Sequence, residues 1–301
     1  MTPQAGDGFP FASHRELDQP PQTRLAEDHF RMGEVELRLV PDAPVFIDGG
    51  AMFGVVPKTL WIKHKIPDDH NRVPVASNCL LVQGPSGTAL IEGGIGEKYS
   101  DKQRDIFGLD DVGRLKRGLK AAQVEPEEVD HVFLTHLHFD HCGAITTYDG
   151  SRLRPTFPRA RHFVQRAEYE IMMNPDPRSS PSYVPDNLEA VREAGLLELV
   201  DGDAQPVPGF ELRLTPGHTA GHQVVLVHTT GGTAAFMGDL IPYRSHLKTT
   251  WVAATDVQPV QTMTTKQSFL AEVRELDYLV VLYHEHIDPV GRFRGDVFER
   301  F

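Results

Sequence analysis

The amino-acid sequence predicts an α+β fold in which strands and a few helices between them share one core. Three observations support this prediction. Strand patterns recur along the chain with helical patterns between them, the 301 residues are enough to bury a substantial core, and no internal repeat of fixed period is evident. We expect residues 1–30 to be an N-terminal arm or extension and residues 31–301 to be one globular domain.

The composition is that of an ordinary folded protein, with 40% hydrophobic and 24% charged residues. A formal net charge of -12 argues against a nucleic-acid partner or an anionic membrane, since both require a positive field. No apolar run approaches the roughly 18 residues of a membrane span, and no signal-peptide pattern is seen, so we expect a cytoplasmic protein. Its two cysteines, Cys79 and Cys142, provide no disulfide framework.

The first elements are an arm and a set of strands. Residues 1–30 are rich in Pro, Gln, Asp and Gly, which favours a flexible arm and is compatible with a homodimer. Residues 34–40 alternate polar and apolar, as a half-buried strand does, and we expect prolines 41 and 44 to end it. Residues 78–82 and 88–91 predict a hairpin whose second strand ends at Glu92 and a glycine loop.

The middle of the chain is predicted to be more helical. The apolar spacing of residues 112–124 predicts an amphipathic helix, and residues 129–134 predict a strand. Residues 163–173 and 187–199 also have helical spacing. The proline-rich segment 174–185 between them is long enough to cover a site.

The last third is predicted to return to strands. Residues 210–214, 223–228 and 233–237 are strand candidates separated by glycine turns. A helix is expected at residues 264–276, and the apolar run 278–283 is expected to form a final buried strand.

Four of these segments share one pattern, in which an apolar strand is followed by residues of a kind that bind metals. Histidine and aspartate side chains are the usual ligands of zinc, iron and related ions. His136 and His138 are two residues apart on extended chain, so their rings point to the same side. The full set at the strand ends is His136, His138, Asp140, His141, His218, Asp239 and His284.

Alternative readings exist for each member of this set. A single histidine at a strand end is more often hydrogen-bonded than metal-bound, and an Asp that follows Gly, such as Asp239, is usually a turn residue. Three histidines and one aspartate within residues 136–141 are rarely a solvated patch. Seven ligands exceed the four of one tetrahedral ion and divide naturally between two, so the sequence predicts a dinuclear site.

The pattern His136-x-His138-x-Asp140-His141, followed by His218, Gly238-Asp239 and a late His284, resembles the metallo-β-lactamase superfamily. The resemblance extends over roughly residues 75–292 and implies a four-layer αβ/βα sandwich with metals at one edge. It assigns His136, His138 and His218 to the first metal. It assigns Asp140, His141 and His284 to the second, with Asp239 bridging both.

Three neighbouring residues are less clearly placed. His286 competes with His284 for the last ligand position, and we prefer His284 because it directly ends the apolar strand. Related sequences often have Asp where this chain has Glu92, so the sequence leaves open whether Glu92 orients a ligand. Cys142 lies beside the cluster, but a small buried thiol is the simpler expectation.

Such a site predicts metal-dependent hydrolysis. Two cations, most simply Zn²⁺ although Fe, Mn or Co suit the same ligands, would lower the pKa of a bridging water and give a hydroxide nucleophile. Asp140 is a candidate proton carrier. Tyr243 lies shortly after Asp239, where related lactonases carry a tyrosine that assists the substrate oxygen, although the spacing matches poorly.

The predicted substrate is a small molecule with a carboxylic ester or lactone bond. Residues 215–223 resemble N-acyl-homoserine lactone lactonases, whereas residues 238–242, His246, Trp251 and Asp256 resemble the methyl parathion hydrolase branch. A phosphotriesterase is therefore the main alternative, followed by a thioesterase, a β-lactamase or an iron-dependent oxidoreductase of the same fold. The acidic net charge argues against a nuclease. A purely structural metal site would have a closed coordination sphere, whereas bridging through Asp239 leaves positions open for water and substrate.

Overall fold

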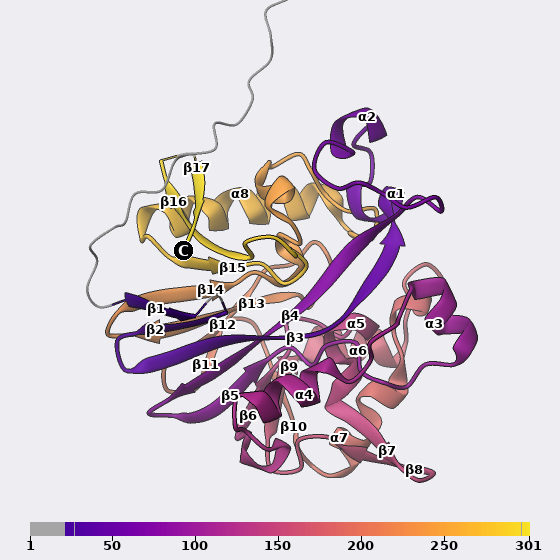
Figure 1. Cartoon of the computed structure of the whole chain (residues 1–301), viewed down its shortest axis with the longest axis vertical. Coiled ribbons are helices and arrows are strands. Elements are labelled where there is room, and N and C mark those ends of the chain that lie inside the picture. The colour runs from indigo at the N-terminus through magenta and orange to yellow at the C-terminus, as the bar shows by residue number, and fades with distance from the viewer. Residues whose placement is uncertain (1–21, 27, 296) are drawn as a thin grey trace, which may run out of the picture.

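The computed structural model describes residues 22–26, 28–295 and 297–301 and contains two large mixed sheets that face each other (Figure 1). The first sheet has the strand order β1-β2-β3-β4-β5-β6-β9-β10. Its strands are β1 (Gln22–Ala26), β2 (His29–Met32), β3 (Val35–Asp48), β4 (Arg72–Gly84), β5 (Gly87–Ile91), β6 (His131–Phe133), β9 (Arg161–Gln165) and β10 (Leu197–Val200).

The second sheet has the order β11-β12-β13-β14-β15-β16-β17, and β7 (Thr146–Asp149) with β8 (Arg152–Pro155) forms a separate hairpin. The strands of the second sheet are β11 (Ala204–Val207), β12 (Phe210–Leu214), β13 (Gln223–Thr229), β14 (Gly232–Phe236), β15 (Leu279–Val281), β16 (Val290–Arg294) and β17 (Val297–Arg300).

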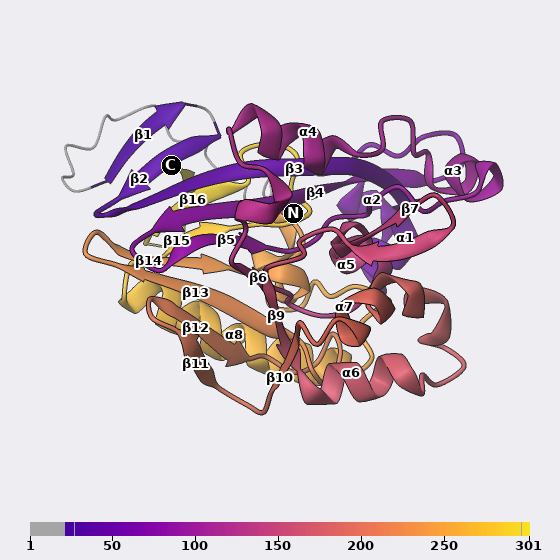
Figure 2. The same ribbon diagram turned by 90° about the horizontal axis from the view of Figure 1, so that it is seen from below.

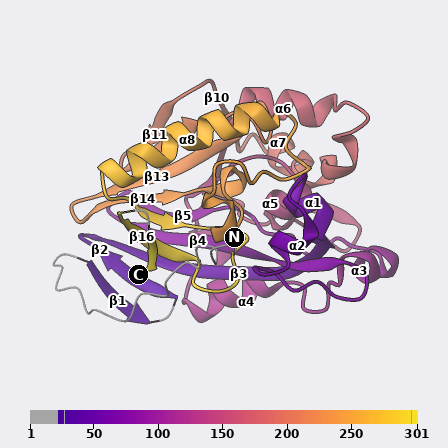
Figure 3. The same cartoon turned by 90° about the horizontal axis from the view of Figure 1, so that it is seen from above.

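Helices cover the outer faces of the two sheets, which gives the predicted four-layer α+β architecture. Figures 2 and 3 show α4 outside the first sheet and α8 outside the second. The helices are α1 (Gly49–Phe53), α2 (Lys58–Trp61), α3 (Asp101–Phe107), α4 (Arg114–Ala121), α5 (Phe139–Cys142), α6 (Arg166–Met173), α7 (Glu189–Glu193) and α8 (Pro259–Glu275).

The main core lies between the sheets and is built from apolar residues of facing strands. Phe133 on β6 is fully buried and stacks on Phe210 of β12 at 4.6 Å between ring centroids, and on Phe163 of β9 at 5.2 Å. Burying a side chain of this size contributes about 2–3 kcal/mol, before any gain from stacking. The core therefore fixes β6 and β12, whose following loops carry site residues.

Strand direction brings the ends of several strands to one edge. β5 and β6 are parallel, as are β14 and β15, while the β4–β5 and β13–β14 turns lie at the opposite end. The loops that follow β5, β6, β12, β14 and β15 consequently meet at the same edge of the sandwich. This edge is called the ligand edge below.

Several predicted boundaries were wrong. β3 does not end at Pro41 or Pro44, because a bulge between Asp42 and Val45 lets the pairing with β4 resume beyond them. Asp42 accepts hydrogen bonds there from the backbone N–H groups of Gly96 (2.8 Å) and Leu115 (3.0 Å), and so ties the bulge to the glycine loop and α4.

Part of the expected N-terminal arm belongs to the first sheet. β2 pairs with β3, and β1 pairs with β2, so the described residues from Gln22 to Phe30 lie in or between strands. Phe30 is buried against the core, whereas a strand of four residues is too short to recognise by its alternation. Residues 1–21 of the expected arm lie outside the described residues.

Two predicted helices are partly strands. Residues 163–165 lie in β9, and the helix expected over 187–199 ends at Glu193, before Gly195 with a φ of +70°. Residues 197–200 form β10, parallel to β9. Short apolar runs fit either period, and only the pairing partner decides between them.

The sequence did not predict α1 and α2, which lie between β3 and β4 and project from the sandwich (Figure 1). Trp61 of α2 stacks on Phe53 of α1 with 5.0 Å between centroids and an interplanar angle of 4°. In the described part of the chain, no helix has the length and apolar character needed to cross a membrane.

Candidate metal centre

All seven predicted ligands meet at the ligand edge, in two clusters. In each cluster the candidate ligand atoms lie within 4.8 Å of one another. The first cluster comes from the loops after β6, β12 and β14, and the second from α5 and the loop after β15. The first contains His136, His138, His218 and Asp239, and the second contains Asp140, His141 and His284.

Asp239 lies between the clusters and turns one oxygen toward each. Its Oδ2 is 3.2 Å from His218 Nε2 of the first cluster. Its Oδ1 is 2.9 Å from His284 Nε2 and 3.4 Å from His141 Nε2 of the second. The carboxylate thus has the placement needed to bridge two cations.

In His218, His284 and His141 the second ring nitrogen is held by an oxygen atom behind it. His218 Nδ1 lies 2.8 Å from Asp256 Oδ1, His284 Nδ1 lies 2.7 Å from the Ala76 carbonyl, and His141 Nδ1 lies 3.2 Å from Glu92 Oε1. With Nδ1–H donating outward, the Nε2 lone pair points into the cluster, which is the form required of a metal ligand.

Glu92 resolves a question that the sequence left open, because it supports two histidines at once. Its buried carboxylate bonds His141 directly and accepts a short hydrogen bond from the Thr135 hydroxyl, which in turn lies 3.0 Å from His136 Nδ1. Glu92 has a φ of +72°, a strained conformation for a residue with a side chain. Such strain persists where the surroundings impose it, often at functional sites.

Glu168 was not identified from the sequence, yet it joins two of the three loops of the first cluster, those after β6 and β12. Its buried carboxylate accepts from the Leu137 backbone N–H at 3.1 Å and from the Thr219 hydroxyl at 2.6 Å. The Tyr183 hydroxyl also donates to it at 2.8 Å, and this tyrosine packs edge-on against His138. Glu168 lies in an ordinary helical pattern, so no local signal distinguishes it.

The position of Asp239 is set by His222, another residue to which the sequence assigned no role. The Asp239 backbone N–H donates to His222 Nε2 at 3.0 Å, and His222 Nδ1 lies 2.8 Å from the Thr215 hydroxyl. Gly238 has a φ of +49°, and a Cβ there would come within 2.7 Å of the His222 ring. Only glycine allows this close approach before the carboxylate.

The donor atoms themselves indicate that the clusters suit metal ions. Within the described residues, His136 Nε2, His141 Nε2 and Asp239 Oδ1 are buried and have no hydrogen-bond partner. Buried polar atoms normally have hydrogen-bond partners, so three potential ligand atoms that lack them and lie in one place require an explanation. Imidazole nitrogens with carboxylate oxygens form a donor set that fits zinc, iron and related divalent ions.

The protonation states of His136, His138 and Asp239 agree with this fit, whereas the Asp239 charge outweighs burial and raises the pKa of His141 and His218, so a cation must displace protons there. Burial lowers the pKa of His136 and His138 well below the usual value for histidine, which keeps both rings neutral near pH 7. Burial alone would raise the pKa of Asp239, but the neighbouring histidines, His284 foremost, hold that pKa well below its usual value. Neutral imidazoles and an ionised carboxylate are the states that bind cations.

The remaining candidates lie outside the clusters. His286 turns away, with Nδ1 2.7 Å from Lys65 Nζ, which leaves His284 in the site. Cys142 is a buried thiol that contacts the carbonyls of Leu137 and His138. Tyr243 is fully buried and its hydroxyl donates to the Pro74 carbonyl at 3.1 Å, so its role toward a substrate stays a prediction.

Comparisons with known proteins agree with this geometry. The family model of the metallo-beta-lactamase superfamily matches residues 72–286. The chain is 29% identical to an N-acyl homoserine lactonase from Bacillus sp over 161 residues, 50% of this chain and 58% of the relative. It is 31% identical to the N-acyl homoserine lactonase AttM from Rhizobium radiobacter over 163 residues, 49% and 57% of the two chains. The match thus spans less than two thirds of these relatives.

Solved structures show the same fold over more of the chain. A probable metal-dependent hydrolase from Staphylococcus aureus superposes with a TM-score of 0.84 at 28% identity, covering 90% of this chain and 98% of the other. AidC, a dizinc quorum-quenching lactonase, superposes with a TM-score of 0.74 at 21% identity, covering 91% and 96%. The family match, the fold and the two clusters together show that this chain belongs to the metallo-β-lactamase superfamily and is related to the N-acyl homoserine lactonases.

Proposed function

We propose that the protein is a dinuclear metal-dependent hydrolase that cleaves a carboxylic ester or lactone. The observation that carries the proposal is the placement of Asp239, whose two oxygens face different ligand clusters. In this proposal His136, His138 and His218 hold one cation, and Asp140, His141 and His284 hold the other. Asp239 belongs to both.

Two cations held at these positions supply Lewis acidity and bring the pKa of a bound water toward neutrality. The protein contributes the arrangement around them. Glu92 and Asp256 orient His141 and His218, while His222 fixes the backbone at Asp239. This preorganisation removes the need for ligands to reorient during the reaction.

Asp140 is the proposed proton carrier because of where it lies. Its Oδ2 is 3.8 Å from His284 Nε2 and 3.9 Å from His141 Nε2, farther than Asp239 lies from the same rings. Asp140 retains 7% exposure, close to the 6% of His138, whereas His136 and His141 are fully buried. A carboxylate at the open side of the site can pass a proton between the reaction centre and the leaving group.

The preference for an ester or lactone rests on the curated relatives and on an apolar wall beside Asp140. Half-buried Phe139 precedes Asp140 and packs at 5.1 Å against Phe107, which in turn meets Tyr99. Such a wall suits the acyl or alkoxy part of an apolar substrate. The nearby segment 174–187 is tied to the loop that carries Asp256, since Arg178 donates to the carbonyls of Ala254 and Asp256.

A substrate panel with defined zinc tests the proposal. We expect turnover of N-acyl homoserine lactones or aryl esters, loss of turnover after chelation, and recovery on adding zinc. Paraoxon-type triesters, thioesters and a chromogenic β-lactam complete the panel. Exclusive turnover of a triester, thioester or β-lactam would refute the ester or lactone assignment, and turnover that survives complete metal removal would refute metal-dependent hydrolysis.

A further inference from the structure

A buried ion pair lies beside the second ligand cluster. Lys65 Nζ is 2.6 Å from Glu285 Oε1, and the two side chains retain only 4% and 5% of their exposure. Lys65 follows α2 in the excursion between β3 and β4, whereas Glu285 directly follows the candidate ligand His284. The pair therefore connects two segments that are 220 residues apart in the sequence.

The Glu285 carboxylate holds three segments together. Oε1 accepts from Lys65 and from the backbone N–H of His286 (3.1 Å), within its own turn. Oε2 accepts from the backbone N–H of Arg244 at 3.1 Å, in the segment that follows Asp239. Glu285 thus links the His284 turn to both the α2 segment and the Asp239 segment.

The other side of the same turn is held by β4. The Ala76 N–H donates to the His284 carbonyl at 3.2 Å, and the Ala76 carbonyl lies 2.7 Å from His284 Nδ1. Asn78 Nδ2 donates to the Glu285 carbonyl at 2.6 Å. These contacts fix the backbone, so the Glu285 side chain and Lys65 close the turn from the opposite side.

Lys65 provides the ammonium that pairs with the Glu285 carboxylate, which also accepts from the backbone N–H groups of Arg244 and His286. Its ammonium also lies 4.3 Å from the centroid of the Tyr243 ring and 2.7 Å from His286 Nδ1. Removing one partner of a buried pair leaves an uncompensated charge. The group that carries this charge then moves toward solvent or becomes hydrated. Here the group that would move is joined by one peptide bond to His284.

We infer that Lys65 is a positioning residue for the second metal, acting through Glu285 on His284. This inference rests on the dinuclear site of the proposed function. It predicts an effect on one metal only, because the first cluster is supported by Asp256 and Glu168, which Lys65 does not contact among the described interactions. Outer groups that orient ligands typically change metal affinity 10–100-fold.

Chelator competition on the zinc-loaded protein tests the inference without any substrate. Lys65→Met keeps the length of the side chain and removes its charge, and should weaken binding of the second metal at least tenfold while the first stays within threefold. His284→Ala identifies which of the two release steps belongs to the second metal. Lys65→Arg, which keeps the charge, should restore most of the affinity.

Two further variants make the result specific. Glu285→Gln keeps the side-chain shape but removes the charge and replaces one acceptor oxygen by an NH2 donor, and should weaken the second metal by threefold or more even if Lys65→Met does not fold. Lys116→Met removes the ammonium of the exposed Lys116–Glu97 pair, which has a similar separation of 2.7 Å, and should leave both affinities within twofold.

Wild-type affinity for the second metal in both Lys65→Met and Glu285→Gln would overturn the inference, as would equal weakening of both metals. A wild-type protein that binds a single metal would overturn the dinuclear proposal together with it. Two tightly bound metals without turnover of any ester or lactone would instead count only against the proposed function, because the release curves do not depend on a substrate.

Discussion

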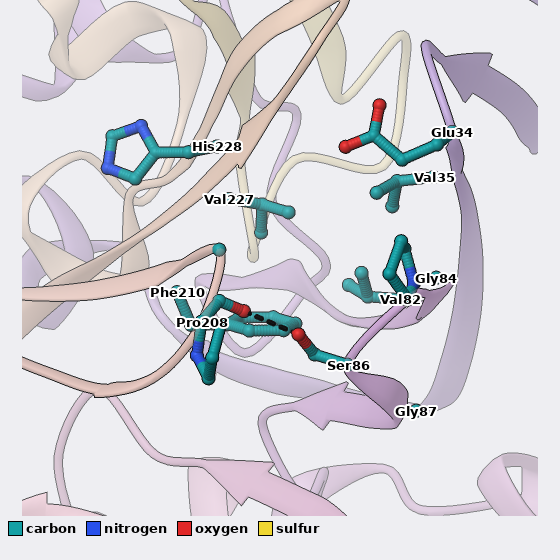
Figure 4. Close-up of a pocket in the computed structure, with 12 residues that line it drawn as sticks. Glu34, Val35, Val82, Gly84, Ser86, Gly87, Pro208, Phe210, Val227 and His228 are labelled. Carbon is teal, nitrogen blue, oxygen red and sulfur yellow. Dashed lines mark hydrogen bonds between the residues drawn. The ribbon is translucent and has the colours of Figure 1, made fainter.

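The two ends of the sandwich differ in how their polar groups are satisfied. At the far end, a cavity of about 220 Å³ lies between the turns of the two sheets (Figure 4). Its polar groups have protein partners: Ser86 donates to the Pro208 carbonyl at 2.7 Å, Glu34 accepts from Thr230, and His228 bonds Glu211 at 2.9 Å. At the ligand edge, by contrast, buried nitrogens and a carboxylate oxygen face one another without hydrogen-bond partners among the described residues.

This difference shows that several unsatisfied ligand atoms in one place identify the site better than empty volume does, since single buried atoms without a partner, such as His162 Nε2, also occur elsewhere. The far-end cavity is lined mainly by apolar residues and glycines of turns, and its charged groups are already paired. The ligand edge instead combines donors that need a cation with a network that holds them in place. The following predictions compare matched changes at the two ends.

The largest difference is expected for removal of a carboxylate. Asp239→Ala takes a donor from both clusters at once, so it should lose the second metal and lower kcat/KM by at least about 10³-fold. Glu34→Ala removes a carboxylate that lines the far-end cavity and should keep kcat/KM within about twofold. Steady-state kinetics and metal analysis measure both. An Asp239→Ala protein with two metals and normal rates would refute the bridging role.

A methyl group added at a glycine should also destabilise the two ends of the sandwich to different extents. At Gly143, after α5, a Cβ would lie 1.8 Å from the Ile95 carbonyl oxygen, and neither backbone can move freely. Gly143→Ala should therefore lower the free energy of unfolding by about 3 kcal/mol. At Gly84 the Cβ would meet the Val35 side chain, with its nearest methyl at 3.0 Å, so Gly84→Ala should cost within about 1 kcal/mol. Urea unfolding gives both values, and equal losses would contradict this account of packing.

Removal of charge from a supporting residue should have an intermediate effect. Glu92→Gln keeps the side-chain shape but weakens the hold on His141 and Thr135, and metal affinity should fall about 10–100-fold. Asp130→Asn alters a carboxylate that accepts from Thr88 N–H at 3.0 Å near the far end, and should leave affinity within about threefold. If Glu92→Gln bound metal as tightly as Asp130→Asn does, Glu92 would not be orienting His141.

The last prediction concerns a buried histidine that lies outside both ends. Burial lowers the pKa of His162 on β9 to about 4, against about 6.5 in an unfolded chain. Between these values the unfolded state binds more protons, so stability is lost as the pH falls from about 6.5 to 4. His162→Gln should make this loss shallower by up to about 1.4 kcal/mol per pH unit. Urea unfolding at pH 7 and pH 4.5 measures the change, and an unchanged slope would show that His162 does not contribute.

The sequence was sufficient to predict the parts of the molecule that are local in the chain. Each ligand follows an apolar strand, so His136, His218, Asp239 and His284 could be assigned to strand ends before their distances were known. Parallel pairing of β5 with β6 and of β14 with β15 then places these ends together. The predicted α+β sandwich and the family resemblance are confirmed by the fold and the family match.

The parts that could not be predicted depend on contacts distant in sequence. Glu168 is 31 residues from Leu137, Asp256 is 38 from His218 and Lys65 is 220 from Glu285, and none lies in a pattern that marks its partner. The strand β10 resembles a helix until its pairing with β9 is known. Local periodicity reports which face of an element is buried but does not report which side chain lies opposite.

The central claim is that two cations share Asp239 at the ligand edge. A crystal of the zinc-loaded protein, measured on both sides of the zinc absorption edge, tests it most directly. The account predicts two anomalous peaks, one within reach of His136, His138 and His218 and one within reach of Asp140, His141 and His284, with an Asp239 oxygen beside each. A single peak, or peaks elsewhere such as at His228 and Glu211 of the far end, would contradict it.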